Sequence, residues 1–428
     1  MILFYRFIFP FIALLAAPYF ILRMFRRGGY GFKFHYRLGL FPLLGKKGKN
    51  AIRVWIQAVS VGELSSLSKI LDTLCKDPNM EIVLTGTTST GLRMAEQKYS
   101  DKVLAQGPFP LDWWLFSCLA WSRVQPDLII TVDSELWPEH FYQAKCRGVP
   151  ALVINARLSD RTFQRLSGSP LARKLLLPKG LEILTTSERQ RARWLEIGVD
   201  EKHIQIVGNL KVDAVDATVE QDKKPEELKA SLGFEKDSLV LAGISTWPGE
   251  EELLIEAMSQ IRKHNIDARL LLIPRHAERR RSIGAMLQQT KFAYHVRTTS
   301  HQAPQDTLVY LADTTGELFK LIHCADLALG GKTFPPNQGG QNPIEPIALG
   351  IPLILGPNYQ NFRQTCSDLL VHDAIRTTEN EEEAISALVE LALNPEGRNQ
   401  LRSSALGWIQ SQGFPSEQTL EKIYHLLR

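Results

Sequence analysis

The sequence predicts an α/β protein built from two doubly wound domains, each with a parallel sheet. Three observations support this. From residue 51, short apolar segments alternate with helical patterns; the alternation stops after Val212; and it resumes beyond a polar, charge-rich stretch at 213–230. The 428 residues, 44% hydrophobic and 22% charged, are enough for two to three domains. This composition excludes a collagen, a coiled coil and a wholly disordered chain.

Ten apolar segments are the expected strands, five on each side of the polar stretch. Those before it are 52–59, 82–85, 128–132, 151–154 and 183–186. Those after it are 239–244, 270–273, 307–311, 327–329 and 352–355. Ligands of open parallel sheets bind beyond the carboxyl ends of the strands. The residues that directly follow these segments are therefore the candidate site residues.

The predicted organisation has five parts. They are an N-terminal membrane anchor (1–27), a basic membrane-proximal segment (28–50), an N-terminal Rossmann-like domain (51–212), a linker (213–230) and a C-terminal Rossmann-like domain (231–428). The last helix, expected from about Ser416, can pack back on the first domain, as C-terminal helices do in similar folds.

The N-terminus is apolar and then basic. A sixteen-residue apolar run, Phe7–Leu22, is followed by three arginines within five residues, and residues 1–62 hold ten Lys and Arg but no Asp or Glu. Since the whole chain carries +4, the remainder carries −6. The run is shorter than the roughly 20 residues of a comfortable span, and Pro10 and Pro18 are expected to interrupt its helix. The cationic flank predicts a cytoplasmic location for all that follows.

Two alternatives remain for this segment. It can be a secretory signal, although no small-residue cleavage site precedes Arg23. It can also be a buried apolar helix followed by a solvated basic tail.

Several common site classes are absent from the sequence. No GxGxxG follows the first strand and no GxxxxGK[ST] occurs, which disfavours dehydrogenases and P-loop NTPases. The five cysteines form no CxxC pair, which argues against a zinc ribbon or a disulfide framework and favours a reducing compartment.

Three polar segments follow strands in the first half. Ser60-Val61-Gly62-Glu63 puts a carboxylate in the first turn of a helix, where it can act as a general base or simply complement the helix dipole. The loop 85–91, with Thr87 and Thr88, offers hydroxyls and glycines for an anion or sugar, or ordinary helix caps. In 133–139, two carboxylates and an indole suit a sugar; alternatively, Trp137 packs and Glu135 caps a helix.

Three further segments follow strands in the second half. Ser245 begins a turn in which Pro248 is expected at the first position of a helix. Arg275 and His276 offer donors to a phosphate, or form a solvated surface turn. In the segment 339–350, Gly339 and Gly340 precede a predicted short helix that is capped by Asn342. Glu345 in this helix can accept hydrogen bonds from a ribose. This last segment suggests a sugar nucleotide.

These segments together resemble one family. The ordered set is SVGE (60–63), TGTTSTG (85–91), SELWP (134–138), NARLSDR (155–161), VGNLKVD (207–213), STWPGEE (245–251), PRHAER (274–279) and GGQNPIEP (339–346). It is similar to the 3-deoxy-D-manno-octulosonic acid (Kdo) transferases of lipopolysaccharide assembly, over about residues 1–375. The resemblance implies a GT-B fold, in which two Rossmann-like domains face each other across a cleft, with an N-terminal membrane-anchor helix.

The resemblance also implies a reaction and a place for it. The family transfers Kdo from CMP-Kdo to a lipid A precursor (lipid IVA), with inversion and without a catalytic metal or other cofactor. The implied partners are these two substrates and the membrane, not nucleic acid, and the implied location is the cytoplasmic face of the bacterial inner membrane.

The resemblance implies residue roles as well, with Glu63 as the general base. The implied donor-binding residues are Lys211, Ser245, Arg275, His276, Gly339, Gly340, Asn342 and Glu345. The implied acceptor-binding residues are Ser60, Gly62, Thr87, Thr88 and Glu135.

This sequence departs from the family pattern near the expected donor site. Trp247 and Gln341 stand where the family usually has histidine, Ala277 where it has proline, and Asp133 where it often has glutamate. Trp247 adds bulk in place of an imidazole, and Gln341 carries no charge. Two alternatives therefore stay open: a membrane-associated GT-B transferase with a different nucleotide sugar or lipid acceptor, and a non-catalytic relative that binds sugar nucleotides.

Overall fold

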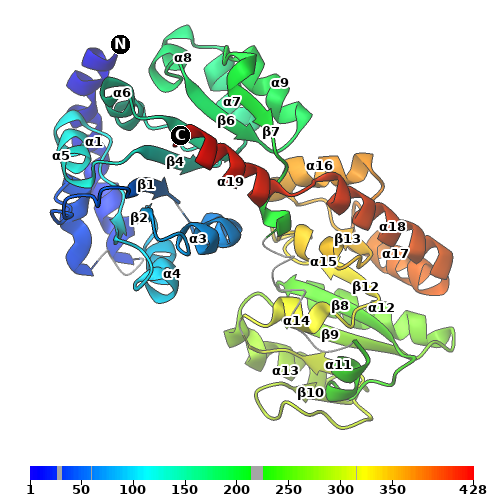
Figure 1. Cartoon of the computed structure of the whole chain (residues 1–428). Coiled ribbons are helices and arrows are strands. Elements are labelled where there is room, and N and C mark those ends of the chain that lie inside the picture. Colours follow the sequence, from blue (N-terminus) through cyan, green and yellow to red (C-terminus); the bar gives the residue numbers. More distant parts are fainter. Residues whose placement is uncertain (27–30, 59, 214–224, 315) are drawn as a thin grey trace. The chain divides into compact units, whose positions relative to one another are not determined.

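The chain folds into two compact units, each with its own parallel sheet (Figure 1). The computed structural model describes residues 1–26, 31–58, 60–213, 225–314 and 316–428. Unit 1 comprises Met1–Ala214 and Gln412–Arg428, and unit 2 comprises Val215–Ser411. Most of the predicted linker, 214–224, lies outside the described residues, and 225–231 form a helix.

Unit 1 contains a seven-stranded parallel sheet in the order β3-β2-β1-β4-β5-β6-β7. The strands are β1 (Ile52–Gln57), β2 (Met80–Gly86), β3 (Ala105–Pro108), β4 (Leu128–Val132), β5 (Ala151–Ala156), β6 (Leu181–Thr185) and β7 (Ile204–Ile206). All five predicted strands are confirmed within a few residues. The edge strands β3 and β7 were not predicted, because AQGP and IQI are too short to show a pattern. The chain reverses its winding direction between β1 and β4, which makes their carboxyl ends the expected ligand position.

Helices cover both faces of this sheet. One hydrophobic cluster includes Trp55, Trp121 and Phe141, and the other includes Ile56, Leu71 and Ile423. The helices, with 3-10 turns labelled η, are α1 (Ile2–Arg26), η1 (Gly31–Leu38), α2 (Val61–Ser66), α3 (Ser68–Leu74), α4 (Ser89–Tyr99), α5 (Trp114–Val124), α6 (Pro138–Arg147), α7 (Asp160–Ser167), α8 (Pro170–Leu176), α9 (Glu188–Glu196), η2 (Glu201–His203) and α19 (Pro415–Leu426).

Helix α1 runs without a break through Pro10 and Pro18, so the predicted interruption is wrong. A proline at position 10 cannot donate to the carbonyl of residue 6. In the structure that carbonyl accepts instead from Trp113 Nε1 at 2.9 Å, which satisfies the group that the proline leaves. Across the described residues, no helix combines the length and the hydropathy that crossing a bilayer demands.

Unit 2 contains a second seven-stranded parallel sheet, in the order β10-β11-β9-β8-β12-β13-β14. The strands are β8 (Leu239–Thr246), β9 (Ala268–Pro274), β10 (Tyr294–Val296), β11 (Val309–Leu311), β12 (Leu327–Gly330), β13 (Leu353–Leu355) and β14 (Arg376–Thr377). The five predicted strands are again confirmed, and the short edge strands β10 and β14 were not predicted. Here the winding reverses between β8 and β12.

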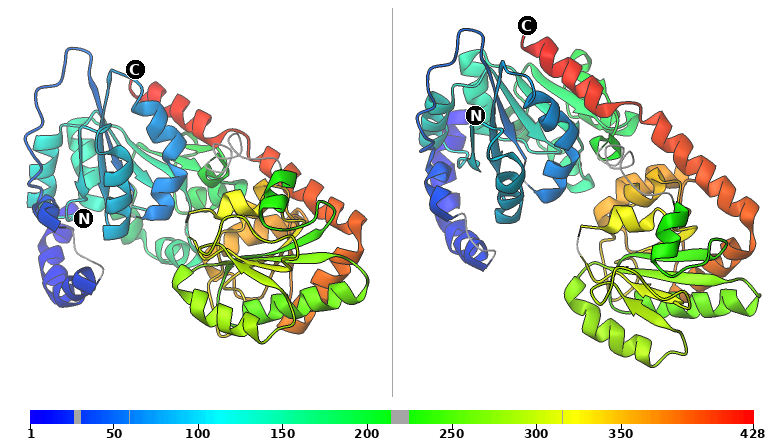
Figure 2. Two further views of the ribbon diagram at one scale, coloured as in Figure 1. Left: turned by 90° about the horizontal axis from the view of Figure 1, so that it is seen from below. Right: turned by 60° about the horizontal axis from the view of Figure 1, so that its bottom comes forward.

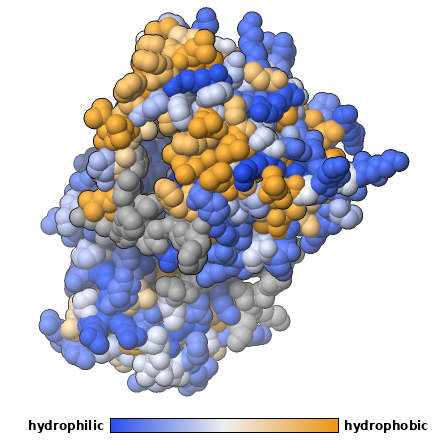
Figure 3. Space-filling model, turned by 90° about the vertical axis from the view of Figure 1, so that its left-hand side faces the viewer, coloured by the Kyte–Doolittle hydropathy of each residue, from blue (hydrophilic) through white to orange (hydrophobic). Residues whose placement is uncertain are grey.

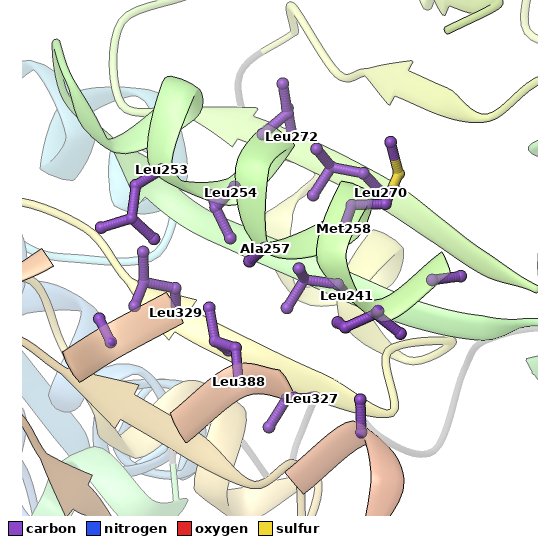
Figure 4. Close-up of a cluster of buried hydrophobic side chains, with 14 of the residues drawn as sticks. Leu241, Leu253, Leu254, Ala257, Met258, Leu270, Leu272, Leu327, Leu329 and Leu388 are labelled. Atoms are coloured by element: carbon purple, nitrogen blue, oxygen red, sulfur yellow. The ribbon is translucent and has the colours of Figure 1, made fainter. Parts of the chain in front are cut away.

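The core of unit 2 packs helices against the central strands. Figure 4 shows Leu254 and Met258 of the first long helix lying against Leu241, Leu270 and other leucines of the sheet. The helices are α11 (Pro225–Ser231), α12 (Glu250–Lys263), η3 (Ala277–Arg279), α13 (Arg280–Gln288), α14 (Leu318–Ile322), α15 (Ile344–Ala348), η4 (Gln360–Phe362), α16 (Arg363–Val371), α17 (Glu381–Leu393) and α18 (Pro395–Ser411).

The last helix, α19, packs on unit 1, as the two views of Figure 2 show. Its Ile423 is fully buried in the core cluster that contains Leu71. Lys422 Nζ lies 2.7 Å from Glu182 Oε2 on β6. The C-terminus of the chain therefore completes the domain that contains the N-terminus.

Candidate active site

Glu63 lies at the carboxyl end of β1, where the winding of the unit 1 sheet reverses. Ser60 is the N-cap of α2; its hydroxyl accepts from the Glu63 backbone N–H (3.4 Å) and lies 3.1 Å from Glu63 Oε1. These two contacts with the Ser60 hydroxyl hold the half-buried carboxylate in the first helical turn. The predicted position of Glu63 is confirmed. Its place in the first turn of α2 also fits the alternative in which it complements the helix dipole.

The loop after β2 lies against this turn. Thr88 caps α4 by accepting from Gly91 N–H at 3.2 Å. A Cβ at Gly91 would come within 3.3 Å of the Ser60 carbonyl carbon, so the starts of α4 and α2 are in contact. Thr87 accepts through Oγ1 from the buried Gln57 (3.1 Å). The structure thus brings Ser60, Glu63, Thr87 and Thr88 together, and Gly62 lies exposed between the first two.

A second carboxylate, Glu135, follows β4 on the other side of the reversal point. Burial raises its pKa to about 7, and the nearby charges of Glu63 and Asp133 raise it as well. The two predicted carboxylates are therefore close enough to influence each other. Near neutral pH, Glu135 therefore carries less than a full negative charge beside Glu63.

Asp133 is held in place by two residues of the next strand and its loop. Asn155 Nδ2 lies 2.6 Å from Asp133 Oδ1, and Arg157 Nη2 lies 2.8 Å from Oδ2. Asp133 and Asn155 both have positive φ, 59° and 51°, a strained backbone for residues other than glycine. Asn155 and Arg157 were not predicted as supports of Asp133, although both belong to the NARLSDR segment.

The alternative in which Glu135 caps α6 is wrong. The backbone N–H groups of Glu139 and His140, at the start of α6, donate to Asp112 at 3.0–3.2 Å. Trp137 packs on Phe109 with 5.3 Å between ring centroids, which confirms the alternative in which the indole has a packing role. Glu135 is thus not needed to cap the helix.

In unit 2, the predicted residues follow β8 and β9. Ser245 has a left-handed backbone, with φ of 54°. Arg275 is exposed, and its backbone N–H donates to Thr246 O at 3.1 Å, which joins the ends of the two strands. His276 stands edge-on to the Trp247 ring, with centroids 5.2 Å apart.

Glu250 organises this end of the sheet, a role that the sequence analysis missed. Helix α12 begins at Glu250, and Gly249 is its N-cap, so the prediction that Pro248 is the first helical residue is wrong. The reason is the buried Glu250 carboxylate, which turns back to accept from the backbone N–H groups of Trp247, Lys332 and Thr333 at 2.8–2.9 Å. It ties the loop after β8 to the loop after β12.

Both glycines of the 339–346 segment are required by close packing. Gly339 (φ 112°) lies where a Cβ would be 2.5 Å from Asn361 Nδ2. Gly340 (φ 73°) lies where a Cβ would be 3.0 Å from Tyr359 Cα. Their N–H groups donate to protein oxygens, from Gly339 to Gln360 Oε1 and from Gly340 to Lys332 O, both at 3.0 Å.

The segment then leads into the five-residue helix α15. This helix begins at Ile344 with Pro343 as its N-cap, one residue later than predicted. Asn342 still assists: its Oδ1 accepts from Ile344 N–H at 3.3 Å, and its Nδ2 donates to Glu345 Oε1 at 3.1 Å. Asn342 and Glu345 thus form a pair beside the two glycines.

Lys211 lies in unit 1, whereas the other predicted donor-binding residues belong to unit 2. Its backbone N–H donates to Asn209 Oδ1 at 3.1 Å. Over the described part of the chain, no group of three or more His, Cys, Asp or Glu side chains comes together as a metal site would require.

The comparisons with known proteins agree with this geometry. Residues 33–214 match the family described as 3-Deoxy-D-manno-octulosonic-acid transferase (kdotransferase). The 3-deoxy-D-manno-octulosonic acid transferase of Haemophilus influenzae is 28% identical over 343 residues, covering 80% of this chain and 79% of the relative. The enzyme of the same name from Chlamydia trachomatis serovar A is 27% identical over 414 residues, covering 95% and 93%.

The chain is similar to the Kdo transferases over most of its length. The resemblance on which the sequence analysis relied is confirmed, and with it the assignment to glycosyltransferases.

Solved structures support the fold. UDP-GlcNAc 2-epimerase of Neisseria meningitidis, bound to UDP-GlcNAc, is similar with a TM-score of 0.61 at 13% identity, covering 87% of this chain and all of the other. The glycosyltransferase of kitacinnamycin gives a TM-score of 0.53 at 12% identity, covering 89% of this chain and all of the other. Together with the two doubly wound sheets, these likenesses confirm the GT-B class.

Proposed function

We propose that this protein moves Kdo from CMP-Kdo to a lipid A precursor, lipid IVA, with inversion and without a catalytic metal. The observation that carries the proposal is the carboxylate pair at the reversal point of the unit 1 sheet. Glu63 is held there by the Ser60 hydroxyl, and the charge of Glu63 affects the pKa of Glu135. The names of the relatives supply the sugar, and the family resemblance of the sequence motifs supplies the class of acceptor.

In this mechanism Glu63 takes the proton of the acceptor hydroxyl as that oxygen attacks the anomeric carbon. The Ser60 hydroxyl and the N-terminal turn of α2 stabilise the ionised carboxylate and orient it. Glu135, with its raised pKa, carries less than a full negative charge near neutral pH, so Glu63 does not face a second complete charge. Together with Thr87 and Thr88, Glu135 contacts the acceptor sugar.

The leaving nucleotide belongs to unit 2. Arg275 binds the phosphate with His276, Glu345 binds the ribose diol, and Asn342 keeps Glu345 in place. Ser245, Gly339 and Gly340 shape the backbone that the donor approaches. Lys211 supplies a cation to the donor's carboxylate or phosphate.

The acceptor is a lipid, and helix α1 offers a surface for a membrane. Among its described side chains, the exposed large apolar ones are Leu3, Phe4, Phe7, Phe11, Ile12, Leu14, Leu15 and Leu22. Trp114 and Leu115 at the start of α5 are also about half exposed, and α5 is joined to α1 through Trp113. Figure 3 looks at this side of the molecule and shows its apolar patches. We place the protein at the cytoplasmic face of the inner membrane, with this face in the lipid interface and the basic segment 28–50 near the headgroups.

A transfer assay tests the reaction. Purified full-length protein is incubated with lipid IVA and CMP-Kdo, and the lipid is analysed by mass spectrometry. We expect a mass gain of one or more Kdo units, reduced about 10²–10⁴-fold in Glu63→Gln. Glu196→Gln, an exposed carboxylate at the end of α9, is the matched control and should keep full activity.

Two outcomes contradict the proposal. Near-normal transfer by Glu63→Gln removes Glu63 from the role of base. No gain with CMP-Kdo, but a gain with another nucleotide sugar, replaces the donor and favours the alternative that Trp247 and Gln341 first suggested.

A further inference from the structure

Lys332 and Trp247 meet at the reversal point of the unit 2 sheet. Trp247 follows β8 and Lys332 follows β12, the adjacent strands between which the winding direction changes. The Lys332 ammonium lies over the Trp247 ring, 4.6 Å from its centroid, in a cation–π contact. Ligands of doubly wound sheets bind at this reversal point, so the ammonium lies where a nucleotide is expected.

The surrounding backbone holds both residues in position. The Glu250 carboxylate accepts from the N–H groups of Lys332 and Trp247 through the same oxygen, at 2.9 and 2.8 Å. A Cβ at Gly331 would come within 2.2 Å of Ser245 O, so the two loops touch at their backbones. This anchoring fixes the stems of the two side chains and leaves their ends to be positioned by each other.

The backbone at Lys332 is also strained. Its φ of 62° is left-handed, a conformation that glycine or asparagine adopts more easily than lysine. Ser245, across the reversal point, has a φ of 54°. Strained positions of this kind cluster at ligand sites, where the side chain or the backbone shape is needed.

The hydrogen bonds of the neighbouring loops show which donors a ligand can use. The N–H groups of Gly331, Gly339 and Gly340 all donate to protein oxygens. Among the described residues, by contrast, no carboxylate forms a salt bridge with Lys332, and the buried Trp247 Nε1 has no hydrogen-bond partner. Side-chain cations, rather than backbone amides, are therefore the donors available to an anion at this point.

We propose that Lys332 binds an anionic oxygen of the nucleotide donor and that Trp247 is its positioning residue. This rests on the proposed function, because it takes the donor to be a sugar nucleotide bound by unit 2. The cation–π contact keeps the ammonium from swinging into solvent, so less side-chain freedom is lost when the anion binds. The anionic oxygen belongs to the phosphate or to the carboxylate of the transferred sugar.

Binding measurements on the full chain test this proposal. Titration calorimetry compares CMP, UMP and cytidine with the wild type, Lys332→Met and Lys332→Arg. Lys332→Met keeps the stem and removes the charge, and we expect it to weaken CMP binding about tenfold or more while leaving cytidine binding unchanged. Lys332→Arg should keep most of the affinity. Lys263→Met, an exposed lysine at the end of α12, is the matched control and should bind like the wild type.

Transfer kinetics separate the two possible oxygens and test Trp247. If CMP binding is unchanged in Lys332→Met but the KM for CMP-Kdo rises about tenfold, the bound oxygen is the sugar carboxylate. Trp247→Leu should raise KM in the same way with kcat little changed, and Trp247→Phe should restore the wild-type KM because it keeps an aromatic face.

The proposal and the proposed function can fail separately. Unchanged CMP affinity and unchanged KM in Lys332→Met overturn the assignment of Lys332. If the wild type binds UMP but not CMP, the proposed donor is wrong, yet a loss of UMP affinity in Lys332→Met still supports Lys332. If the wild type binds neither nucleotide, both are overturned.

Discussion

Arg6 forms a bidentate ion pair with Glu139, whose side chain is fully buried. Arg6 Nε lies 2.8 Å from Glu139 Oε2, and Arg6 Nη2 lies 2.8 Å from Oε1. Next to this pair, the Tyr5 hydroxyl donates to Asp112 at 2.7 Å. Helix α1 is therefore fastened to α6 and the start of α5 by charged and polar groups near its first turn, while most of its apolar face stays exposed.

Loss of Arg6 should destabilise unit 1. Removing one partner of a buried ion pair leaves an uncompensated charge, so we expect Arg6→Met to lower the free energy of unfolding by about 2–4 kcal/mol. Urea unfolding of the full chain, followed by tryptophan fluorescence, measures this, since six of the eight tryptophans lie in unit 1. Lys202→Met, in an exposed pair with Asp200, should cost less than about 0.5 kcal/mol.

The same pair predicts a rescue. Adding Glu139→Gln to Arg6→Met neutralises the buried group and should recover part of the lost stability. If the double variant is no more stable than Arg6→Met, charge burial is not the cause of the loss.

The apolar face of α1 should carry membrane binding. We expect Phe7→Asp combined with Leu15→Asp to lower the vesicle-bound fraction more than tenfold, because each exposed apolar side chain contributes about 1.5–3 kcal/mol when it leaves water. Flotation with vesicles of phosphatidylethanolamine and phosphatidylglycerol measures the bound fraction. Leu171→Asp, at a position 63% exposed on α8, is the control and should bind like the wild type. Equal losses in both proteins would contradict a role for α1.

Glu135 should make the stability of the chain fall as the pH rises. Its pKa is raised from 4.5 to about 7 in the folded state, so its stabilising contribution is complete below pH 4.5 and is lost as the pH rises through 7. Glu135→Gln stays neutral, and we expect it to be about 1–2 kcal/mol more stable than the wild type at pH 8 and equal to it at pH 4.5. Thermal unfolding at the two pH values measures this; an equal effect at both would show that Glu135 does not titrate there.

Glu317 in unit 2 should show the opposite dependence. Hydrogen bonds from Arg297, at 2.6 and 2.7 Å, lower the pKa of Glu317 to about 2. Its contribution is therefore present above its ordinary pKa of 4.5 and is lost as the pH falls through 2. Allowing for solvent screening, we expect Glu317→Gln to cost about 1–2 kcal/mol at pH 7 and progressively less below pH 4.5. Differential scanning calorimetry of the full chain measures it, and a cost that persists at low pH would contradict the ion pair.

The central strands of both sheets could be predicted from the sequence, whereas the short edge strands could not. Strands such as Leu128–Val132 are apolar throughout because helices cover both sides of the sheet, and that pattern is visible without a structure. Edge strands such as Ala105–Pro108 lack this apolar pattern.

The effect of Pro10 on helix α1 was predicted wrongly for a related reason. The hydrogen bond that compensates for the proline comes from Trp113, more than a hundred residues away.

In the candidate site, too, local contacts could be predicted from the sequence, whereas contacts between distant segments could not. The contacts between Ser60 and Glu63 join residues three positions apart and are a local signal. The pairing of Glu135 with Glu63 depends on β1 and β4 being neighbours in the sheet, which no local pattern encodes. The role of Glu250 could not be predicted from the sequence, because two of its partners, the backbone amides at 332 and 333, lie more than eighty positions further on.

The sequence by itself therefore determined the fold class, the family resemblance and the residues that follow each strand, because burial patterns, turns and caps act over a few residues. The tertiary structure alone decided which of those residues meet: Lys332 with Trp247, Arg6 with Glu139, and Glu135 with Glu63. The physical reason is that the order of strands in a sheet brings distant segments together, and charge, burial and pKa depend on the neighbours so acquired.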